Sequence, residues 1–215
     1  MLSSPHLKTL LATLISFAGC VTAQADDITI TDIAGRQVTL NAPAEGVILG
    51  EGRQIYLLGL LEPEAPFAHV VGWREDFSQA DPDNYSRYLK RFPEIEAIPT
   101  FGGFKDGTFD VEQAASLNPD VVLMNIEAKA ATEDAAYDDK LAQLGIPIIY
   151  VDFREDPLEH TIPSMRIIGQ IMDDEEAAEE FIEFAETQLA RVTDVIAEAN
   201  PERPSVFIDR AGGYS

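Results

Sequence analysis

Cysteine and positive charge are both scarce in this sequence. Cys20 is the single cysteine among 215 residues, so no disulfide bond can form within the chain. Fifteen lysines and arginines stand against 38 aspartates and glutamates, which gives a formal net charge of −23. Because phosphate groups are bound by basic surfaces, this balance argues against a nucleic-acid partner and against an anionic membrane surface. An acidic shell keeps a protein soluble, and any anionic ligand must then be met by local arginines.

Histidine and the motifs of common enzymes are scarce as well. The three histidines, His6, His69 and His160, lack the spacing of metal ligands. There is no G-x-S-x-G motif and no histidine after His160, so a serine-hydrolase triad is not supported. No G-x-G-x-x-G or P-loop pattern supports a nucleotide site. The sequence therefore predicts a protein that is not an enzyme and has no metal site or cofactor of its own.

Residues 1–25 have the features of an export signal. Lys8 supplies positive charge, and residues 9–21 are apolar but too short for a stable membrane anchor. The Ala-Gln-Ala of residues 23–25 matches the small-x-small cleavage pattern and predicts a mature chain that begins at Asp26. The alternative is a lipoprotein signal in residues 17–20, in which Cys20 is lipidated. Both interpretations place the mature protein outside the cytoplasm.

Four short apolar runs predict the strands of one parallel sheet. They span residues 46–50, 70–73, 121–125 and 146–152. None alternates apolar with polar residues, and predicted helices separate them, which is typical of a parallel sheet buried on both faces. These helices span residues 54–61, 84–92, 111–117, 134–144 and 158–172. A hairpin over residues 28–40 precedes the sheet, because two alternating runs flank Ala34-Gly35. The predicted fold class is α/β, with a three-layer lobe over residues 26–172.

A long amphipathic helix is predicted over residues 173–199. Its first turn is acidic, as the helix dipole favours, and its apolar residues recur every three or four positions. Asn200-Pro201 ends it. About 27 residues give a rod of roughly 40 Å. One more strand-like run, residues 205–209, follows before the sequence ends. We therefore interpret residues 173–200 as a helix that leaves one lobe and residues 201–215 as the start of a second lobe.

Three motifs in this order resemble one protein family. Residues 32–40, Asp-Ile-Ala-Gly-Arg-Gln-Val-Thr-Leu, resemble the opening D-x-x-G-R-x-V hairpin of the periplasmic binding proteins that serve iron-siderophore, haem and cobalamin ABC importers. Residues 109–122 resemble the family's segment that leads to L-x-P-D-L-V, and residues 144–149 resemble its L-G-I-P-V strand entry. The resemblance runs from about Ile28 to the end of the chain.

The resemblance implies two α/β lobes joined by one long helix, with the ligand in the cleft between them. This chain would supply the first lobe, the backbone helix and the first strand of a second, missing lobe, so we expect it to be a fragment. The partner implied is an ABC permease of the inner membrane. The protein itself is expected to be a monomer in the periplasm. Glu112 matches the glutamate with which the family docks on the permease; the alternative is an acid that only stabilises a helix N-terminus.

The ligand implied is a small metal chelate, with a ferric siderophore first and haem or cobalamin as alternatives. Such chelates often carry anionic oxygens, which a guanidinium binds through two hydrogen bonds. The predicted ligand-binding residues follow strands or open the second lobe: Arg53, Trp73, Arg74, Arg154 and Arg210. The alternatives are surface ion pairs for the arginines and core packing for the tryptophan. A sensor ectodomain with the same fold is the alternative function.

Overall fold

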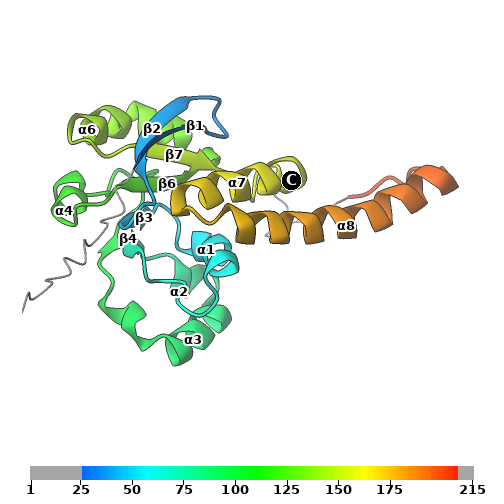
Figure 1. The fold of residues 1–215 in the computed structure, drawn as a ribbon, viewed down its shortest axis with the longest axis horizontal. Helices are drawn as coiled ribbons and strands as arrows, with labels where there is room; N and C mark the ends of the chain where they lie inside the picture. The colour runs from blue at the N-terminus through cyan, green and yellow to red at the C-terminus, as the bar shows by residue number, and fades with distance from the viewer. Residues whose placement is uncertain (1–25, 208–215) are drawn as a thin grey trace, which may run out of the picture.

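The computed structural model describes residues 26–207, which form an α/β lobe and a projecting helix (Figure 1). The centre is a five-stranded sheet in the order β5-β4-β3-β6-β7. All of its neighbouring strands are parallel. The strands are β3 (Val47–Leu49), β4 (Val70–Arg74), β5 (Thr100–Phe101), β6 (Val121–Asn125) and β7 (Ile148–Val151). The predicted parallel sheet is therefore confirmed, and the short strand that the sequence predicts near residues 98–101 is β5, at one edge.

Helices cover both faces of the sheet. The helical elements are η1 (Gly52–Gln54), α1 (Ile55–Leu61), α2 (Phe77–Ala80), α3 (Pro82–Arg91), η2 (Pro93–Ala97), α4 (Val111–Ser116), η3 (Ile126–Ala128), α5 (Lys129–Asp134), α6 (Tyr137–Gln143), α7 (Pro157–Met172) and α8 (Glu175–Ala199). One face packs against α1 and α7, and the other packs against α4 and α6. The three-layer architecture follows from this arrangement. None of the helices among residues 26–207 is both long and apolar enough to cross a bilayer.

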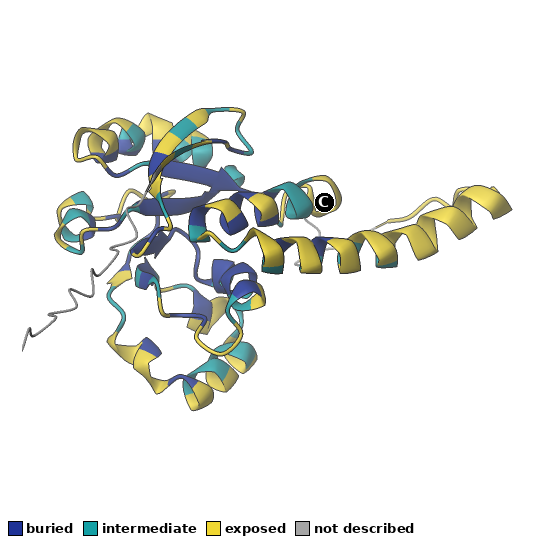
Figure 2. Ribbon diagram, viewed as in Figure 1, coloured by how far each residue is buried: buried dark blue, intermediate teal, exposed yellow. Residues whose placement is uncertain are grey.

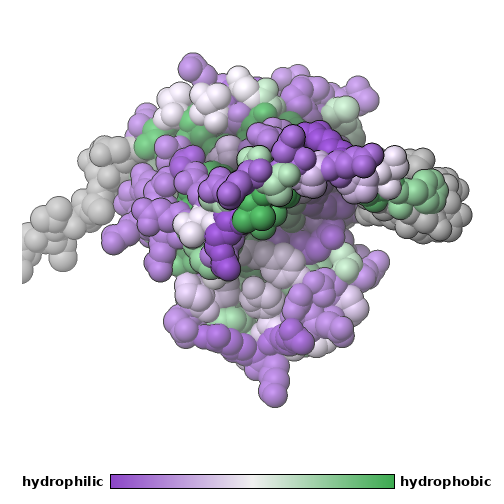
Figure 3. Space-filling model, turned by 90° about the vertical axis from the view of Figure 1, so that its right-hand side faces the viewer, coloured by the Kyte–Doolittle hydropathy of each residue, from purple (hydrophilic) through white to green (hydrophobic). Residues whose placement is uncertain are grey.

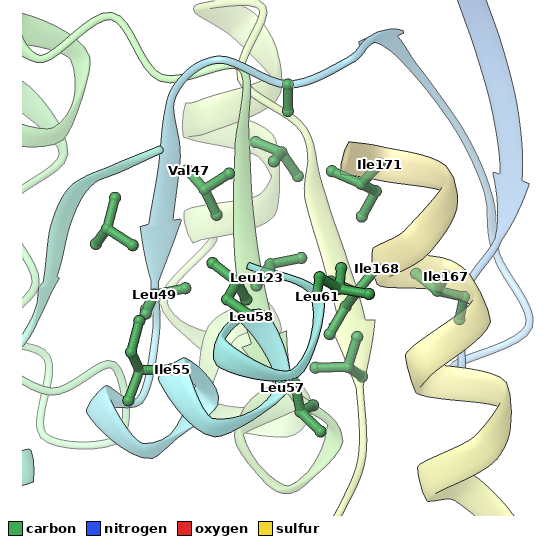
Figure 4. Close-up of a cluster of buried hydrophobic side chains, with 14 of the residues drawn as sticks. Val47, Leu49, Ile55, Leu57, Leu58, Leu61, Leu123, Ile167, Ile168 and Ile171 are labelled. Carbon is green, nitrogen blue, oxygen red and sulfur yellow. The ribbon is translucent and has the colours of Figure 1, made fainter. Parts of the chain in front are cut away.

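Alternate residues of each central strand feed two separate cores. In β3, Val47 and Leu49 face the α1/α7 side, where Leu123, Ile168 and further apolar side chains join them (Figure 4). Ile48, between them, belongs to the opposite core. Every residue of β3, β6 and β7 is buried (Figure 2). This burial explains why the runs read as continuously apolar, and it fixes the sheet as a rigid platform for the loops at its edges.

The hairpin of β1 (Asp26–Thr31) and β2 (Gln37–Ala42) is joined to the sheet by the D-x-x-G-R motif. Asp32, with its side chain fully buried, accepts hydrogen bonds from Nε and Nη2 of Arg36 at 3.0 and 2.8 Å. It also accepts one from the Tyr150 N–H of β7 at 3.2 Å. Gly35 has φ +76°, a conformation that only glycine adopts without strain. The motif is therefore a structural clamp between the hairpin and the sheet.

The long helix is confirmed as α8, and only its first part is buried. Asp174 caps it by accepting the Ala177 N–H at 3.3 Å. Ala178 and Ile182 are each 1% exposed, against α7 and α1. Beyond them the apolar stripe lies open; Val192 is 58% exposed. Figure 1 shows these later turns extending away from the lobe. In Figure 3, which looks onto this side, apolar patches interrupt a largely hydrophilic surface.

The structure corrects three details of the predicted elements. The helix predicted from Gln54 begins with a 3-10 turn, and α1 proper starts at Ile55. The helix predicted over 134–144 spans only Tyr137–Gln143 as α6, because Ala136 has φ +53° and separates it from α5, a further helix that the prediction missed. Residues 205–207, predicted as the start of a strand, have no regular structure and are exposed. A strand needs a neighbouring strand to pair with, and none of the described strands borders this segment.

Candidate functional site

The candidate site lies at the carboxyl edge of the sheet, where the loops after β3, β4, β6 and β7 meet. In open parallel sheets this edge is the usual ligand position. The strand ends and the loops after them bring together Glu51, Arg74, Asn125 and Arg154. A small depression at this edge is lined by Gly50, Glu51, Arg74, Phe104, Lys105, Met124, Asn125, Glu127 and Ala128. The fold therefore places charged and amide side chains around one concave point.

Glu51 is the centre of this site. Its side chain is only 5% exposed, and it forms ion pairs with Arg53 and with Arg154, the latter through Nη1 at 2.8 Å. The Asn125 amide donates a further hydrogen bond to the same carboxylate. A buried charge is stable only when it is paired and hydrogen-bonded in this way. Glu51 therefore holds two arginines, which come from different loops, beside each other.

Amide side chains support Glu51 from below. Gln54 donates from Nε2 to Oδ1 of Asn125 at 3.0 Å, and its Oε1 accepts the Glu51 N–H at 3.2 Å. The two glycines around Glu51 allow the close packing. A Cβ atom at Gly50 would lie 2.7 Å from the Met124 sulfur, and one at Gly52 would lie 2.6 Å from Cβ of Phe77. The Gly-Glu-Gly sequence after β3 is thus required by the geometry of the site.

Arg154 is positioned by the turn that follows β7. Asp152, 1% exposed, accepts the backbone N–H groups of Arg154, Glu155 and Asp156 at 2.8, 2.9 and 3.0 Å, and its Oδ2 lies 2.8 Å from Nδ1 of His160. Burial raises the pKa of Asp152, but these hydrogen bonds outweigh that effect and hold the pKa below its ordinary value. The aspartate therefore remains charged and fixes the loop that carries Arg154.

Each cation of this edge already has a carboxylate partner. Arg154 also pairs with Glu127 at 3.0 Å, and Lys105 pairs with the same Glu127 at 3.4 Å. Arg74 lies 3.7 Å from Asp76. Burial lowers the pKa of Arg154, but the neighbouring carboxylates Glu51 and Glu127 have the larger combined effect and raise it. The surface ion-pair interpretation of the arginines thus describes this structure, and an anionic ligand would have to share or replace those partners.

The arginines remain accessible in spite of these pairs. Their side chains are exposed by 27% for Arg53, 34% for Arg74 and 31% for Arg154. These three predicted residues lie at one edge of the sheet, around Glu51. Arg210, the fourth predicted arginine, lies outside the described residues. Among the described residues, no group of three or more His, Cys, Asp or Glu side chains is arranged to hold a metal ion.

The structure corrects the expectation that Trp73 faces a ligand. Its side chain belongs to the α1/α7 core and the residue is 3% exposed. Its ring makes edge contacts with Phe67 at 5.6 Å and Phe77 at 5.8 Å. Trp73 and Arg74 are adjacent in β4, so their side chains point to opposite sides. The alternative interpretation, core packing, is therefore the one observed.

Sequence reasoning places the ligand at the loops that begin at Glu51, Trp73, Asn125 and Asp152, but it does not name Glu51, Asn125 and Asp152 as site residues. All three stand where the prediction places the ends of strands, and that position was the available signal. Glu51 and Asp152 each lie two or fewer residues from a predicted ligand-binding arginine, so an ion pair was foreseeable for Arg53 and a capped turn for Arg154. Only the folded structure shows that the loop carrying Arg154 lies close enough to Glu51 for the two arginines to share this carboxylate.

Glu112 lies apart from this cluster, in the first turn of α4. It is exposed, and its carboxylate forms no ion pair or hydrogen bond with another described residue. Asp110 caps the helix instead, by accepting the N–H groups of Glu112 and Gln113 at 2.9 and 3.0 Å. The side chain of Glu112 is therefore available to a partner, and it is not needed to begin the helix.

Comparisons with known proteins agree with this fold. A family model described as periplasmic binding protein matches residues 73–215. The structure of the TroA-like periplasmic binding protein FepB from Veillonella parvula is 32% identical, with a TM-score of 0.74, over 82% of this chain and 51% of that one. The petrobactin-binding protein YclQ from Bacillus subtilis is 18% identical, with a TM-score of 0.56, over 81% and 55%. The molybdate-binding protein MolA from Haemophilus influenzae is 17% identical, with a TM-score of 0.60, over 76% and 52%. No curated protein matches the sequence.

The chain thus spans about half the length of the solved structures it matches. The likeness to YclQ and MolA shows the fold alone, because so few residues are identical. The similarity to FepB is stronger in both sequence and structure.

Proposed function

This chain belongs to the periplasmic binding protein family, and we propose that it is the substrate-binding component of an ABC importer that captures a ferric siderophore outside the cytoplasm. Members of this family bind solutes and are not enzymes. The single observation that carries the proposal is the carboxyl-edge site, where the accessible Arg53 and Arg154 pair with Glu51 and the accessible Arg74 lines the same depression. The ligand would lie between this edge and a second lobe, and the mature protein would act in the periplasm as a monomer.

Two facts support an anionic chelate as the ligand. Guanidinium groups bind carboxylate and other oxygen anions through paired hydrogen bonds, and three of them lie at this edge. Structures that share the fold include one that binds petrobactin and one that binds a complex of acinetobactin with ferric iron. A tyrosine can ligate haem iron, but Tyr85 and Tyr88 pack against the aromatic core around Phe77 instead of lying at the edge, so haem is less well supported.

We expect Arg74→Ala to weaken binding of the cognate ligand by about tenfold to a hundredfold, which is the usual loss for a central interfacial arginine. Arg74 is the best choice because its only ion pair among the described residues is the long one to Asp76, so its loss disturbs the fold least. Calorimetry with the full-length mature protein should be run against catecholate, hydroxamate and carboxylate ferric siderophores, ferric citrate, haem and cobalamin. Arg166→Ala, on α7 and paired with Glu179, is the matched control.

The outcomes of this titration separate the claims. Tight binding of one ferric siderophore that Arg74→Ala weakens and Arg166→Ala leaves unchanged would support both ligand class and site. Binding of haem or cobalamin in its place would keep the family role and remove the siderophore. Failure of every chelate to bind would overturn the proposed ligand class.

Glu112 is proposed as the residue through which this lobe docks on the permease. Its carboxylate is exposed and without a partner among residues 26–207, as a docking group requires. In the family the docking glutamate meets an arginine of the permease, so Glu112→Arg would bring two positive charges together, which costs several kcal/mol. In cells that express the importer, this variant should lower ligand uptake about tenfold or more. Ligand affinity in calorimetry should not change. Glu94→Arg, at another exposed position, is the control; normal uptake by the Glu112 variant would exclude the docking role.

A further inference from the structure

A groove beside α3 has the shape and chemistry of a second small-molecule site. Its volume is about 320 Å³, and none of its lining residues belongs to the carboxyl-edge site. It runs between α3, the end of α1 and the loop after α1, in the lower part of the lobe in Figure 1. The lining residues are Gly59, Pro63, Pro66, Asn84, Arg87, Tyr88, Arg91 and Phe92. Sites for small ligands begin at about this size.

The walls of the groove are flat, apolar and rigid. The Tyr88 ring lies 5.6 Å from Phe67, nearly perpendicular to it, and 6.2 Å from Phe92 in a tilted arrangement. These contacts fix its orientation. Pro63 and Pro66 add surfaces without rotatable side chains. Gly59 leaves the space in front of the tyrosine open, because a Cβ atom there would lie 3.2 Å from the Tyr88 hydroxyl oxygen. The walls therefore suit a planar ring.

Arg87, Tyr88 and Arg91 are the donors that the groove offers to an anion, whereas the Asn84 amide already donates to Asp81 and Tyr56. Asn84, Arg87, Tyr88 and Arg91 are spaced by three or four residues along α3, so they share one helical face. Arg87 makes only a 3.4 Å contact with Asn84. Burial raises the pKa of Tyr88, so its hydroxyl is a donor at neutral pH. Two guanidinium groups and a phenol together, in a protein with a net charge of −23, are an unusual local excess of donors.

The existing ion pair at the groove does not block such a ligand. Arg91 pairs with Glu64 at 2.7 Å, but their side chains are 56% and 86% exposed. An exposed pair of this kind contributes little free energy, because water and salt screen it. A ligand carboxylate with its ring packed on the aromatic wall would therefore replace Glu64 at small cost.

We propose that this groove binds a small aromatic carboxylate, with the carboxylate on Arg87 and Arg91 and the ring against Tyr88 and Phe92. This inference does not depend on the proposed transport function, since the two sites share no residue. The ligand class follows from the combination of flat walls and paired cations. A phosphate ion would use the cations and leave the walls uncovered, and a neutral aromatic alcohol would use only the walls.

The test is a titration of the mature protein with benzoate and with 1-naphthoate. Calorimetry and the amide chemical shifts in NMR spectra measure the binding. Benzyl alcohol and inorganic phosphate are the control ligands. We expect saturable binding of at least one aromatic carboxylate, weakened at least tenfold in both Arg87→Gln and Arg91→Gln, and unchanged in Arg166→Gln. Both arginines are exposed, so the variants should fold normally.

Three results with the ligands alone would overturn the proposal. They are no saturable binding of either carboxylate, equal binding of benzyl alcohol, and equal binding of phosphate. Unchanged affinity in both Arg87→Gln and Arg91→Gln would also overturn it, because the carboxylate would then bind elsewhere. Arg74→Ala should leave the binding of aromatic carboxylates intact. The groove proposal can therefore fail or succeed independently of the proposed carboxyl-edge site.

Discussion

Replacing Asp32 with alanine should lower the free energy of unfolding by about 3 to 5 kcal/mol, the range found when one partner of a buried ion pair is removed. The carboxylate is fully buried, and it accepts four hydrogen bonds, three from Arg36 and one from the Tyr150 N–H. Without it, a strand N–H in β7 loses its acceptor. Arg36 keeps only Asp138, the Ile148 carbonyl and the Tyr150 ring as partners. The hairpin would then be held to the sheet only by these contacts, by the Ile33 N–H on the Tyr150 carbonyl, at 3.0 Å, and by the packing of apolar side chains such as Ile30 and Leu40.

Urea unfolding of the mature protein, followed by far-ultraviolet circular dichroism, measures this loss. Asp138→Ala is the matched control, because Asp138 also binds Arg36, at 2.8 Å, but its side chain is 23% exposed. Its removal leaves Arg36 paired with Asp32 but also takes an acceptor from the Tyr150 hydroxyl, at 3.2 Å, so we expect a loss of about 1 to 2 kcal/mol. Equal losses in the two variants would show that the buried clamp is no more important than the surface pair.

The fold could be predicted well because its signals are local. The strands β3, β6 and β7 are continuous apolar runs, and α8 shows an uninterrupted three- and four-residue period. Both patterns follow from burial, because buried positions are apolar and their spacing along the sequence shows which residues are buried. The strand order β5-β4-β3-β6-β7 is not local, so the sequence does not reveal which strands are neighbours. Left-handed residues such as Ala136 also leave no trace in the sequence.

The site was predictable in position and unpredictable in detail. Its loops follow from the rule that ligands bind at the carboxyl ends of parallel strands, and Arg53, Arg74 and Arg154 lie there. The sequence does not reveal that Glu51 pairs with Arg154, which is 103 positions away along the chain. Nor does it reveal which of the adjacent residues Trp73 and Arg74 faces the core. That choice depends on the register of β4 against β3 and β5.

The contacts in the structure explain the role of the D-x-x-G-R motif. As a pattern it indicated a family, and the structure gives it a mechanical reason. Asp32 and Arg36 stand at the two ends of a turn that needs Gly35 in a left-handed conformation, and both side chains then reach β7. The motif carries fold information and takes no part in the candidate site.

Replacing Glu51 with alanine should be the most damaging change within the candidate site. It would leave Arg53 and Arg154, each about 30% exposed, without their shared partner. It would also leave the buried Asn125 amide without its acceptor. Removing one partner of a hydrogen-bonded charge cluster costs more than the cluster itself contributes, because the remaining charges stay desolvated. We expect a loss of about 3 kcal/mol in the free energy of unfolding, measured by urea titration.

Glu127 provides the control for this prediction. It also pairs with Arg154, at 3.0 Å, yet its side chain is 18% exposed and makes no contact comparable to that of Glu51 with Asn125. Glu127→Ala should therefore cost about 1 kcal/mol. If Glu127→Ala loses as much stability as Glu51→Ala, the two carboxylates hold Arg154 equally.

A double-mutant cycle isolates the contact itself. The coupling between Glu51→Ala and Arg154→Ala should be about 1 to 3 kcal/mol, and the coupling between Glu127→Ala and Arg154→Ala should be below about 1 kcal/mol. A large first coupling means that Glu51 fixes the direction of Arg154 before any ligand arrives. The guanidinium would then be preorganised, and less conformational entropy would be lost when an anionic ligand binds. If the two couplings are equal, Arg154 is held loosely by both acids, and ligand binding would have to order it.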